Sequence, residues 1–394
     1  MARRSLSFTV SRTTTRQALM VTPPTFYPPG AHIREEIEAR GWSQADLADV
    51  LGVSAKTVNE ILTAKRSITT ETARALGEAF GTGAEVWLRL EGRYQLSRLA
   101  EPGDAVSRRA RLYSKAPVGE LQRRGWLMEA SSIVDLESQV CYLLRIEHID
   151  AEPTPFPLAA RASNSSTGDW TPSQLAWYCR ARQLGEGIEV SSRYTHKKLD
   201  AAIARLRELM LAPDEARHAP RILSEAGVRL VIVEPLAGTK IDGVAIYDVK
   251  KPIVALSLRF DRIDYFWFTL MHELAHIRCE HTGHLDQNKD GGGAAIDDGI
   301  APWEREANDF AAAALVPQDK LTSFISRVQP FFSRKKIEGF AVLHDVHPGI
   351  VLGQLKNRKA VPWRNLHVLH AKVRDTVTAS ALCDGWGHFM GTEE

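Results

Sequence analysis

Two histidines and a glutamate stand in the order His272-Glu273-x-x-His276, inside an apolar run without glycine or proline. Such a run is typical of a helix, and residues four apart on a helix point to the same side. Both imidazoles can therefore reach one metal ion, whereas Glu273 lies one step around the helix, beside the open coordination position. A carboxylate there can take a proton from water on the metal, so the spacing predicts a hydrolytic metal centre.

The same spacing also arises by chance, so the prediction needs a third ligand. A catalytic zinc ion usually has three protein ligands and one water. Residues 302–317 are predicted to form a second helix, with a proline near its start and another just past its end. We expect Glu304 to bind Zn²⁺ and Asn308, on the same face, to orient a histidine. Glu306 lies on another face and is expected to be a solvated carboxylate at the helix start.

Residues 226–317 resemble the ImmA/IrrE family of metallopeptidases. The resemblance is carried by the histidine motif and by these segments: Asp242-Gly243, Leu256-Ser-Leu-Arg-Phe260, Phe268-Thr-Leu, Glu304-Arg-Glu-Ala-Asn308, Phe310-Ala-Ala and Leu315-Val-Pro317. It implies that His272, His276 and Glu304 bind the metal and that Glu273 is the catalytic base. The Gly- and Asp-rich stretch 284–300 departs from the family pattern, so the resemblance does not describe the rim of the cleft.

The composition is that of a globular protein. The 394 residues suggest two or three domains, and 44% of them are hydrophobic. A formal net charge of +2 requires neither a nucleic acid nor a membrane partner. No apolar run is long enough to span a bilayer. The four cysteines are scattered without C-x-x-C spacing, which indicates a reducing, cytoplasmic location.

The first hundred residues predict an arm and a helical bundle. Residues 1–25 are rich in Ser, Thr and Arg and lack acids, and we expect a disordered basic arm rather than an organelle transit peptide. Residues 26–100 are expected to form a compact domain. Two short helices, 43–51 and 54–63, joined by a turn at Gly52, form a helix-turn-helix pattern. The block resembles the HigA-type antitoxin branch of the XRE helix-turn-helix family.

In this pattern the second short helix reads DNA. Lys56, Thr57 and Asn59 are expected to face the major groove, and Lys65 and Arg66 to lie beside phosphates. Acids slightly outnumber bases between residues 31 and 98, which is unusual for a tight DNA binder. A helix-turn-helix can also dock a protein. If the partner is an operator, a homodimer on a two-fold site is the expected assembly.

The remaining segments place these sites in the chain. Residues 101–220 carry no chemical motif and are expected to form a helical linker or sensor region. Residues 221–375 are expected to form the metallopeptidase domain, and 376–394 a flexible tail. Within that domain three strands are predicted, and a strand beside a cleft can pair with an extended peptide: 228–233, 243–247 and 252–258.

Two further features have weaker signals. Residues 337–355 resemble a second, degenerate helix-turn-helix, to which we assign no DNA contacts. Four histidines could stabilise an oxyanion beside the metal, or could each have a structural role: His281, His284, His344 and His347.

The sequence therefore predicts a multidomain, mainly α protein: an N-terminal helix-turn-helix bundle, a helical middle segment, and an α+β, zincin-like metallopeptidase domain with a small sheet. The predicted function is a DNA-binding transcriptional regulator fused to a zinc endopeptidase that cleaves a repressor or another regulatory protein. Two alternatives stay open. The chain could be a repressor whose metal domain only holds or senses zinc, or a HigA-like antitoxin that blocks a toxin partner by docking.

Overall fold

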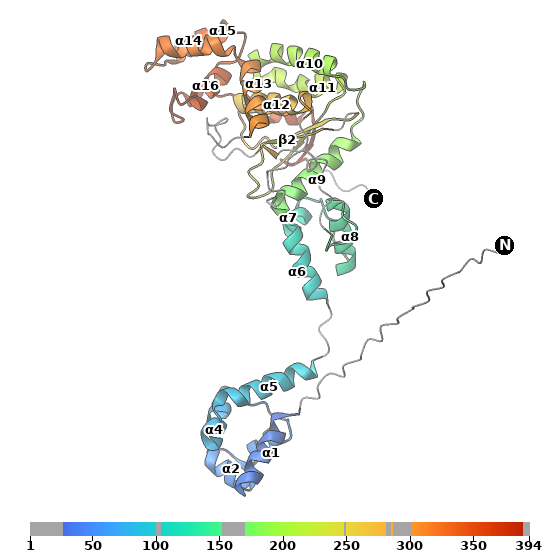
Figure 1. The fold of residues 1–394 in the computed structure, drawn as a ribbon, viewed down its shortest axis with the longest axis vertical. Helices are drawn as coiled ribbons and strands as arrows, with labels where there is room; N and C mark the ends of the chain where they lie inside the picture. Colours follow the sequence, from blue (N-terminus) through green and yellow to red (C-terminus); the bar gives the residue numbers. More distant parts are fainter. Residues whose placement is uncertain are drawn as a thin grey trace, which may run out of the picture. The chain divides into compact units, whose positions relative to one another are not determined.

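The computed structural model describes residues 27–99, 104–151, 170–247, 250–280, 285–286 and 301–388. The chain divides into two compact units, residues 1–104 and residues 105–394 (Figure 1). Among the described helices, none has the length and apolar character needed to cross a membrane. The predicted basic arm, 1–25, lies outside the described residues.

The described part of the first unit is a helical bundle around one core, in which Trp87 is 2% exposed. Ser43 starts the second helix with a capping box, and Gly52 ends it in the left-handed region at φ 66°. Ser54 then caps the third helix, so the predicted helix-turn-helix is confirmed. The helices are α1 (Pro29–Arg40), α2 (Gln44–Leu51), α3 (Ala55–Leu62), α4 (Thr70–Phe80) and α5 (Ala84–Arg98).

The second unit is built on a small mixed sheet with strand order β4-β2-β3-β1-β5. Strand β1 runs parallel to β3 and β5, whereas β2 is antiparallel to β3 and β4. The described strands are β1 (Arg229–Val233), β2 (Gly243–Ile246), β3 (Ile253–Leu256), β4 (Leu285–Asp286) and β5 (Leu382–Asp384).

Helices cover both faces of this sheet (Figure 1). Leu230 and Ile232 of β1 pack in the core that contains α12 (Ile263–Arg278), whereas Val231 and Val233 pack in the core that contains α9 (Pro172–Gly187). This alternation follows from the two-residue period of a strand. It explains why β1, β2 and β3 are buried along their whole length.

The middle segment packs with the sheet rather than apart from it. Trp177 of α9 donates its indole N–H to the carbonyl of Val233 over 3.1 Å. A Cβ atom at Gly185 would lie 2.6 Å from Ile253, so α9 lies directly on β3. Residues 105–220, expected to be a linker or sensor region, thus belong to the same compact unit as the metal motif. Their other helices are α6 (Ala105–Lys115), α7 (Val118–Arg123), α8 (Ile133–Leu144), α10 (His196–Glu208) and α11 (Ala219–Glu225).

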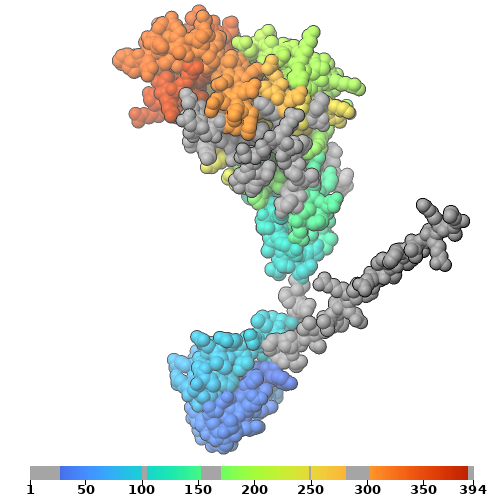
Figure 2. Space-filling view, viewed as in Figure 1, coloured from blue at the N-terminus to red at the C-terminus, as the bar shows by residue number. Residues whose placement is uncertain are grey.

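The helices after the sheet complete the second unit. Within it, α14 to α16 lie at the end opposite α6 to α8 (Figure 2). Helix α16, the second helix of the degenerate helix-turn-helix, buries Ile350, Val351 and Leu355 in the core, so it cannot enter a DNA groove. The described helices here are α13 (Pro302–Leu315), α14 (Gln318–Val328), α15 (Arg334–Val342), α16 (Pro348–Asn357) and α17 (Arg374–Thr378).

The expectation of a flexible tail over residues 376–394 is wrong for β5. This strand pairs with β1, and Asp384 forms a buried ion pair with Arg180 of α9 at 2.6 Å. The contact lies more than 200 positions away in the sequence, and three residues carry too short a pattern to predict a strand. Residues 389–394 lie outside the described part.

Candidate metal centre

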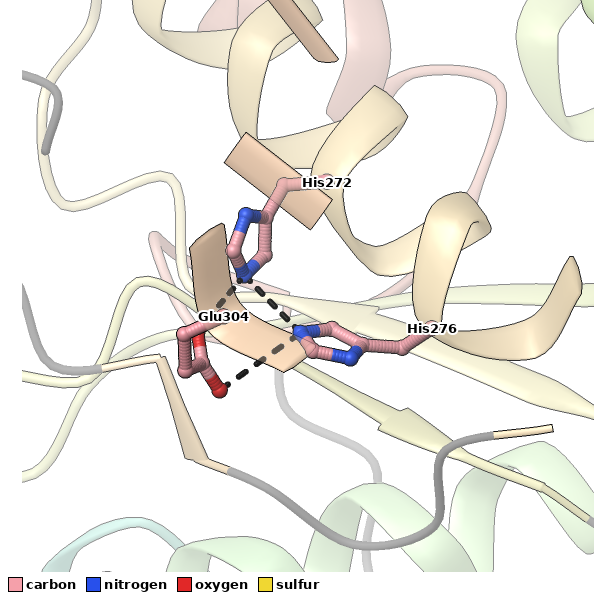
Figure 3. A group of neighbouring side chains, drawn as sticks. All are labelled: His272, His276 and Glu304. Atoms are coloured by element: carbon pink, nitrogen blue, oxygen red, sulfur yellow. Dashed lines mark hydrogen bonds and ion pairs between the residues drawn. The ribbon is translucent and has the colours of Figure 1, made fainter. Parts of the chain in front are cut away.

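Helices α12 and α13 bring the three predicted ligands together. The Nε2 atoms of His272 and His276 are 3.0 Å apart. Glu304 places one carboxylate oxygen 3.3 Å from His272 Nε2 and the other 3.6 Å from His276 Nε2 (Figure 3). Within the described part of the chain, these residues form the group of side chains able to hold a metal ion, with ligand atoms within 4.8 Å of one another.

Small residues let the two helices approach. Ala307 and Ala311 of α13 and Ala275 of α12 are fully buried, so no long side chain separates the helix backbones. Phe268, one turn before His272, stacks on its imidazole with 6.3 Å between the ring centroids and 28° between the planes. The helix contact sets the place of Glu304, and the phenyl ring restricts the orientation of His272.

The electrostatics suit a cation. Both histidines are buried. Burial raises the pKa of Glu304, but hydrogen bonding to His272 and His276 outweighs burial and holds this pKa well below its usual range. An ionised carboxylate and two imidazoles are the ligand set of many catalytic zinc sites, which keep one further position open. The residues present therefore fit Zn²⁺.

Glu273 is fully buried between α12 and β2. A Cβ atom at Gly243 would lie 2.7 Å from Glu273 Oε1 and 3.0 Å from Thr269 Cγ2. Any side chain larger than that of glycine at position 243 would displace the Glu273 carboxylate. The sequence reasoning did not assign this role to Gly243, although a glycine at the start of a buried strand was a signal for a close approach.

Asn308 is half-buried on α13, one turn after Glu304. No hydrogen bond joins it to either histidine among the described residues, so its orienting role stays a prediction. Glu306 is exposed, as expected, and its Oε1 lies 3.5 Å from Cys279 Sγ.

The additional histidines do not join the ligand group that the described residues form. His347 begins α16, where its Nδ1 accepts a hydrogen bond from the Gly349 N–H at 3.0 Å. His344 packs on Phe340 with 4.5 Å between ring centroids. Both contacts are structural, which favours the structural alternative for these two residues. His281 and His284 lie outside the described part.

The predicted DNA-contacting residues lie on or just after α3. Lys56, Asn59, Lys65 and Arg66 are exposed. Thr57 is half-buried, and its hydroxyl lies 2.9 Å from Ser54 Oγ at the start of the helix, so it also helps to cap α3. Helix α3 thus presents two exposed polar side chains near its first turn.

Comparison with known proteins separates the chain in the same way. A family model described as "Helix-turn-helix" matches residues 33–87, and a peptidase family model described as "IrrE N-terminal-like domain" matches residues 225–330. Virulence-associated protein I of Dichelobacter nodosus is 40% identical over 80 residues, which are 20% of this chain and 74% of that protein. The chain belongs to the helix-turn-helix family. Its second unit contains an IrrE-like, metallopeptidase-like domain, so the predicted resemblances are confirmed.

Solved structures similar to this helix-turn-helix protein match a small share of it. Antitoxin HigA of Pseudomonas aeruginosa, solved with the higBA promoter, is 38% identical and covers 18% of this chain and 79% of its own, with a TM-score of 0.18. A putative antidote protein of a plasmid maintenance system from Nostoc punctiforme is 36% identical and covers 18% of this chain and 77% of its own, also with a TM-score of 0.18.

Proposed function

We propose that this protein is a DNA-binding regulator whose second unit is a zinc-dependent endopeptidase. The observation that carries the proposal is the convergence of His272, His276 and Glu304 from two helices, with Glu273 buried in the next position of the same motif. When bound there, zinc would polarise a peptide carbonyl and make water more acidic. The Glu273 carboxylate takes the proton from the attacking water and delivers it to the leaving amine.

The edge of the sheet supports a peptide as the substrate. Strand β2 lies against Glu273, and β4 pairs with it at Gly243 and Val244. Beyond Val244, the outer edge of β2 has no strand partner in the described part of the chain. An extended peptide that hydrogen-bonds there would continue along the strand whose first residue, Gly243, lies against Glu273. We infer that the substrate is a protein segment, in a repressor or another regulator.

The first unit would direct this activity to a promoter. Lys56 and Asn59 are exposed on α3, the helix that reads the major groove in this class of domain. Lys65 and Arg66 follow the helix and can bind phosphates. A homodimer on a two-fold operator is the assembly that this geometry favours.

The Glu273→Gln variant tests the peptidase. The purified full chain is analysed for zinc and then incubated with proteins encoded by neighbouring genes, with cleavage followed by mass spectrometry. We expect the wild type to make one specific cut and Glu273→Gln to keep zinc and make none. Glu306→Gln, an exposed carboxylate two residues after Glu304, is the matched control and should retain both. Equal cleavage by Glu273→Gln would contradict the role of Glu273 as the base, whereas a fully zinc-loaded wild type that cuts nothing would favour the repressor that only holds zinc.

The antitoxin alternative rests on a different observation. The similar solved structures include a HigA antitoxin and an antidote protein, and the helix-turn-helix family model matches residues 33–87. If this chain also blocks a toxin, a small toxin should co-purify with the full chain. Residues 27–99 expressed alone should then retain it, because the helix-turn-helix family match, residues 33–87, lies within them.

A further inference from the structure

A small pocket lies between α12, α13 and α16, with a volume of about 60 Å³. We call it the α12–α16 pocket. Its floor is apolar and includes Phe268, Leu315 and Ile350. Its polar lining includes the guanidinium groups of Arg262 and Arg358 and the carboxylate of Asp264, which pairs with Arg262. It therefore combines an apolar base with two guanidinium groups.

This pocket borders the metal centre. Phe268 lines it and also stacks on the imidazole of His272. Helix α13 contributes Leu315 to the floor and Glu304 to the metal ligands. A group bound in the pocket would contact the ring that packs on a metal ligand.

Positive charge exceeds negative charge around the pocket. Asp264 is buried and pairs with Arg262, while its Oδ1 lies 3.2 Å from His370 Nδ1. Lys356 is 2% exposed, and its Nζ lies 3.0 Å from His370 Nε2. The His370 ring thus lies between the Lys356 ammonium group and the Asp264 carboxylate. Asp264 therefore pairs directly with Arg262, whereas Lys356 reaches it only through the His370 ring.

Arg358 adds a third cation in the polar lining. Its guanidinium donates to the hydroxyl of Thr322 over 2.9 Å and to the side-chain oxygen of Gln318, both of which are neutral groups. No carboxylate lies within ion-pair distance of Arg358 in the part of the chain that the structure describes. The described lining of the pocket therefore contains two guanidinium groups and a single carboxylate, and the buried Lys356 lies close to it.

A buried cation without a full counter-charge is unfavourable, and an anion nearby relieves the cost. In agreement with this, burial and the neighbouring Arg262 lower the pKa of Lys356. Guanidinium groups bind carboxylates and phosphates in two-pronged geometry. A cavity of about 150 Å³ holds a benzene molecule, so a pocket of this volume admits only a smaller group.

We propose that the α12–α16 pocket binds a small oxyanion, a carboxylate or phosphate group, beside the metal centre. The oxyanion group enters between Arg262 and Arg358, and any short apolar part rests on Phe268 and Leu315. Two sources offer this chemistry. One is a free small anion that acts as an effector, and the other is an acidic side chain of the cleaved peptide, which rests on the proposed function.

Titration with simple anions tests the site directly. The zinc-loaded full chain is titrated with inorganic phosphate and with acetate at constant ionic strength in chloride, by calorimetry and by thermal unfolding. We expect saturable binding with a rise in the unfolding temperature of the second unit. Arg358→Gln should weaken it at least about tenfold, as the loss of one charge-assisted hydrogen bond predicts. Arg327→Gln, an exposed arginine of α14 outside the pocket lining, should bind like the wild type.

A second variant blocks the pocket without changing its charge. Ala312 of α13 is half-buried and lines the pocket, so Ala312→Leu places three more carbon atoms in it. We expect this variant to fold, keep zinc and lose anion binding. Binding that survives both Arg358→Gln and Ala312→Leu would place the anion elsewhere and overturn the proposal.

Matched peptides distinguish the two sources. Extended peptides with Glu or Gln at each successive position are compared for binding to the zinc-loaded chain. If free anions bind, the site serves an effector, and this result stands even if the chain cleaves nothing. If free anions do not bind, but Glu peptides bind about tenfold better than Gln peptides and Arg358→Gln removes this preference, the site holds a substrate side chain. If neither free anions nor Glu peptides show this binding, the proposal is overturned.

Discussion

At the scale of single residues, the carboxylate of Glu273 and the backbone of Gly243 occupy adjoining space. The contact is so close that a methyl group at position 243 would meet the glutamate oxygen at 2.7 Å. Because Glu273 is fully buried, its side chain cannot swing into solvent to escape. Its position therefore depends on a glycine in a neighbouring strand.

The Gly243→Ala substitution should separate cleavage from metal binding. The added methyl group displaces the Glu273 carboxylate but touches none of the three metal ligands. We expect zinc content to stay at the wild-type level and cleavage of the specific substrate to fall at least about a hundredfold, as expected for a displaced proton-transfer group. Metal analysis and single-turnover cleavage measure the two effects.

Gly339→Ala is the matched control for this change. Gly339 lies in α15 of the same unit, and a Cβ atom there would meet nothing within 4 Å. The Gly339→Ala variant should keep the wild-type zinc content and cleavage rate. If Gly243→Ala cleaved as fast as this control, the contact with Glu273 would have no part in catalysis.

The sequence shows why some of these residues could be predicted. The ligands His272 and His276 lie one helical turn apart, so the period of the helix alone places them together. Glu304 could be proposed because α13 has its own boundary signals and an alanine-rich face. The contact of Gly243 with Glu273 and the stacking of Phe268 on His272 depend on how β2 and the side chains pack against α12, and no local pattern records that.

At the scale of elements, β5 is held on the sheet by a buried charge pair. Arg180 and Asp384 are 2% and 1% exposed, and each is the other's charge partner across α9 and β5. Burial raises the pKa of Asp384, while Arg180 opposes the shift. Removal of the guanidinium would leave the buried carboxylate without the cation that forms its ion pair.

Arg180→Met should therefore destabilise the second unit by about 3–5 kcal/mol, the usual cost of breaking a buried ion pair. Urea unfolding of the full chain, followed by tryptophan fluorescence, measures the loss. Arg182→Met is the matched control, because Arg182 pairs with the partly exposed Glu186 on the same helix. That variant should lose less than about 1 kcal/mol. Similar losses in the two variants would show that the buried pair does not hold β5.

The same pair explains the error over the C-terminal tail. A three-residue strand between glycine-rich and polar segments has no period that a sequence can reveal. Its stability comes from β1 and from Arg180, and both lie far away in the chain. By contrast, β1, β2 and β3 were predicted because each is a continuous apolar run bounded by turn residues.

The third helix of the first unit allows a prediction about DNA. Asn59→Ala should reduce binding to the promoter of the protein's own gene by about 1–3 kcal/mol, because the amide would contact a base edge. Arg66→Ala should weaken binding to all sequences and reduce the salt dependence by about one phosphate contact. Fluorescence anisotropy at several salt concentrations measures both effects.

Arg74→Ala tests whether these effects are specific to the predicted surface. Arg74 is exposed on α4, where it lies 3.8 Å from Glu78. The Arg74→Ala variant should bind DNA like the wild type. If all three variants bound DNA equally well, α3 would not be the reading helix, and a protein-docking role for the first unit would be favoured.

At the scale of the whole molecule, the chain divides between the DNA-binding unit and the unit that holds the metal centre. The core cluster of the first unit shares no residue with the two core clusters of the second, so each unit has its own hydrophobic interior among the described residues. The three proposed metal ligands all belong to the second unit. We therefore expect two unfolding transitions in the full chain, only one of which responds to zinc.

Removal of zinc by a chelator should lower the unfolding temperature of the second unit and leave that of the first unchanged. A ligand that binds only the folded state stabilises it by about 2.7 kcal/mol when its free concentration is about 100 times Kd. Differential scanning calorimetry with and without chelator measures the shift, and residues 27–99 expressed alone identify the transition of the first unit. Glu304→Gln, which removes one ligand charge, should show a smaller response to chelation. If the transition of residues 27–99 moved with zinc, or if the second transition did not, the metal would not be bound by His272, His276 and Glu304.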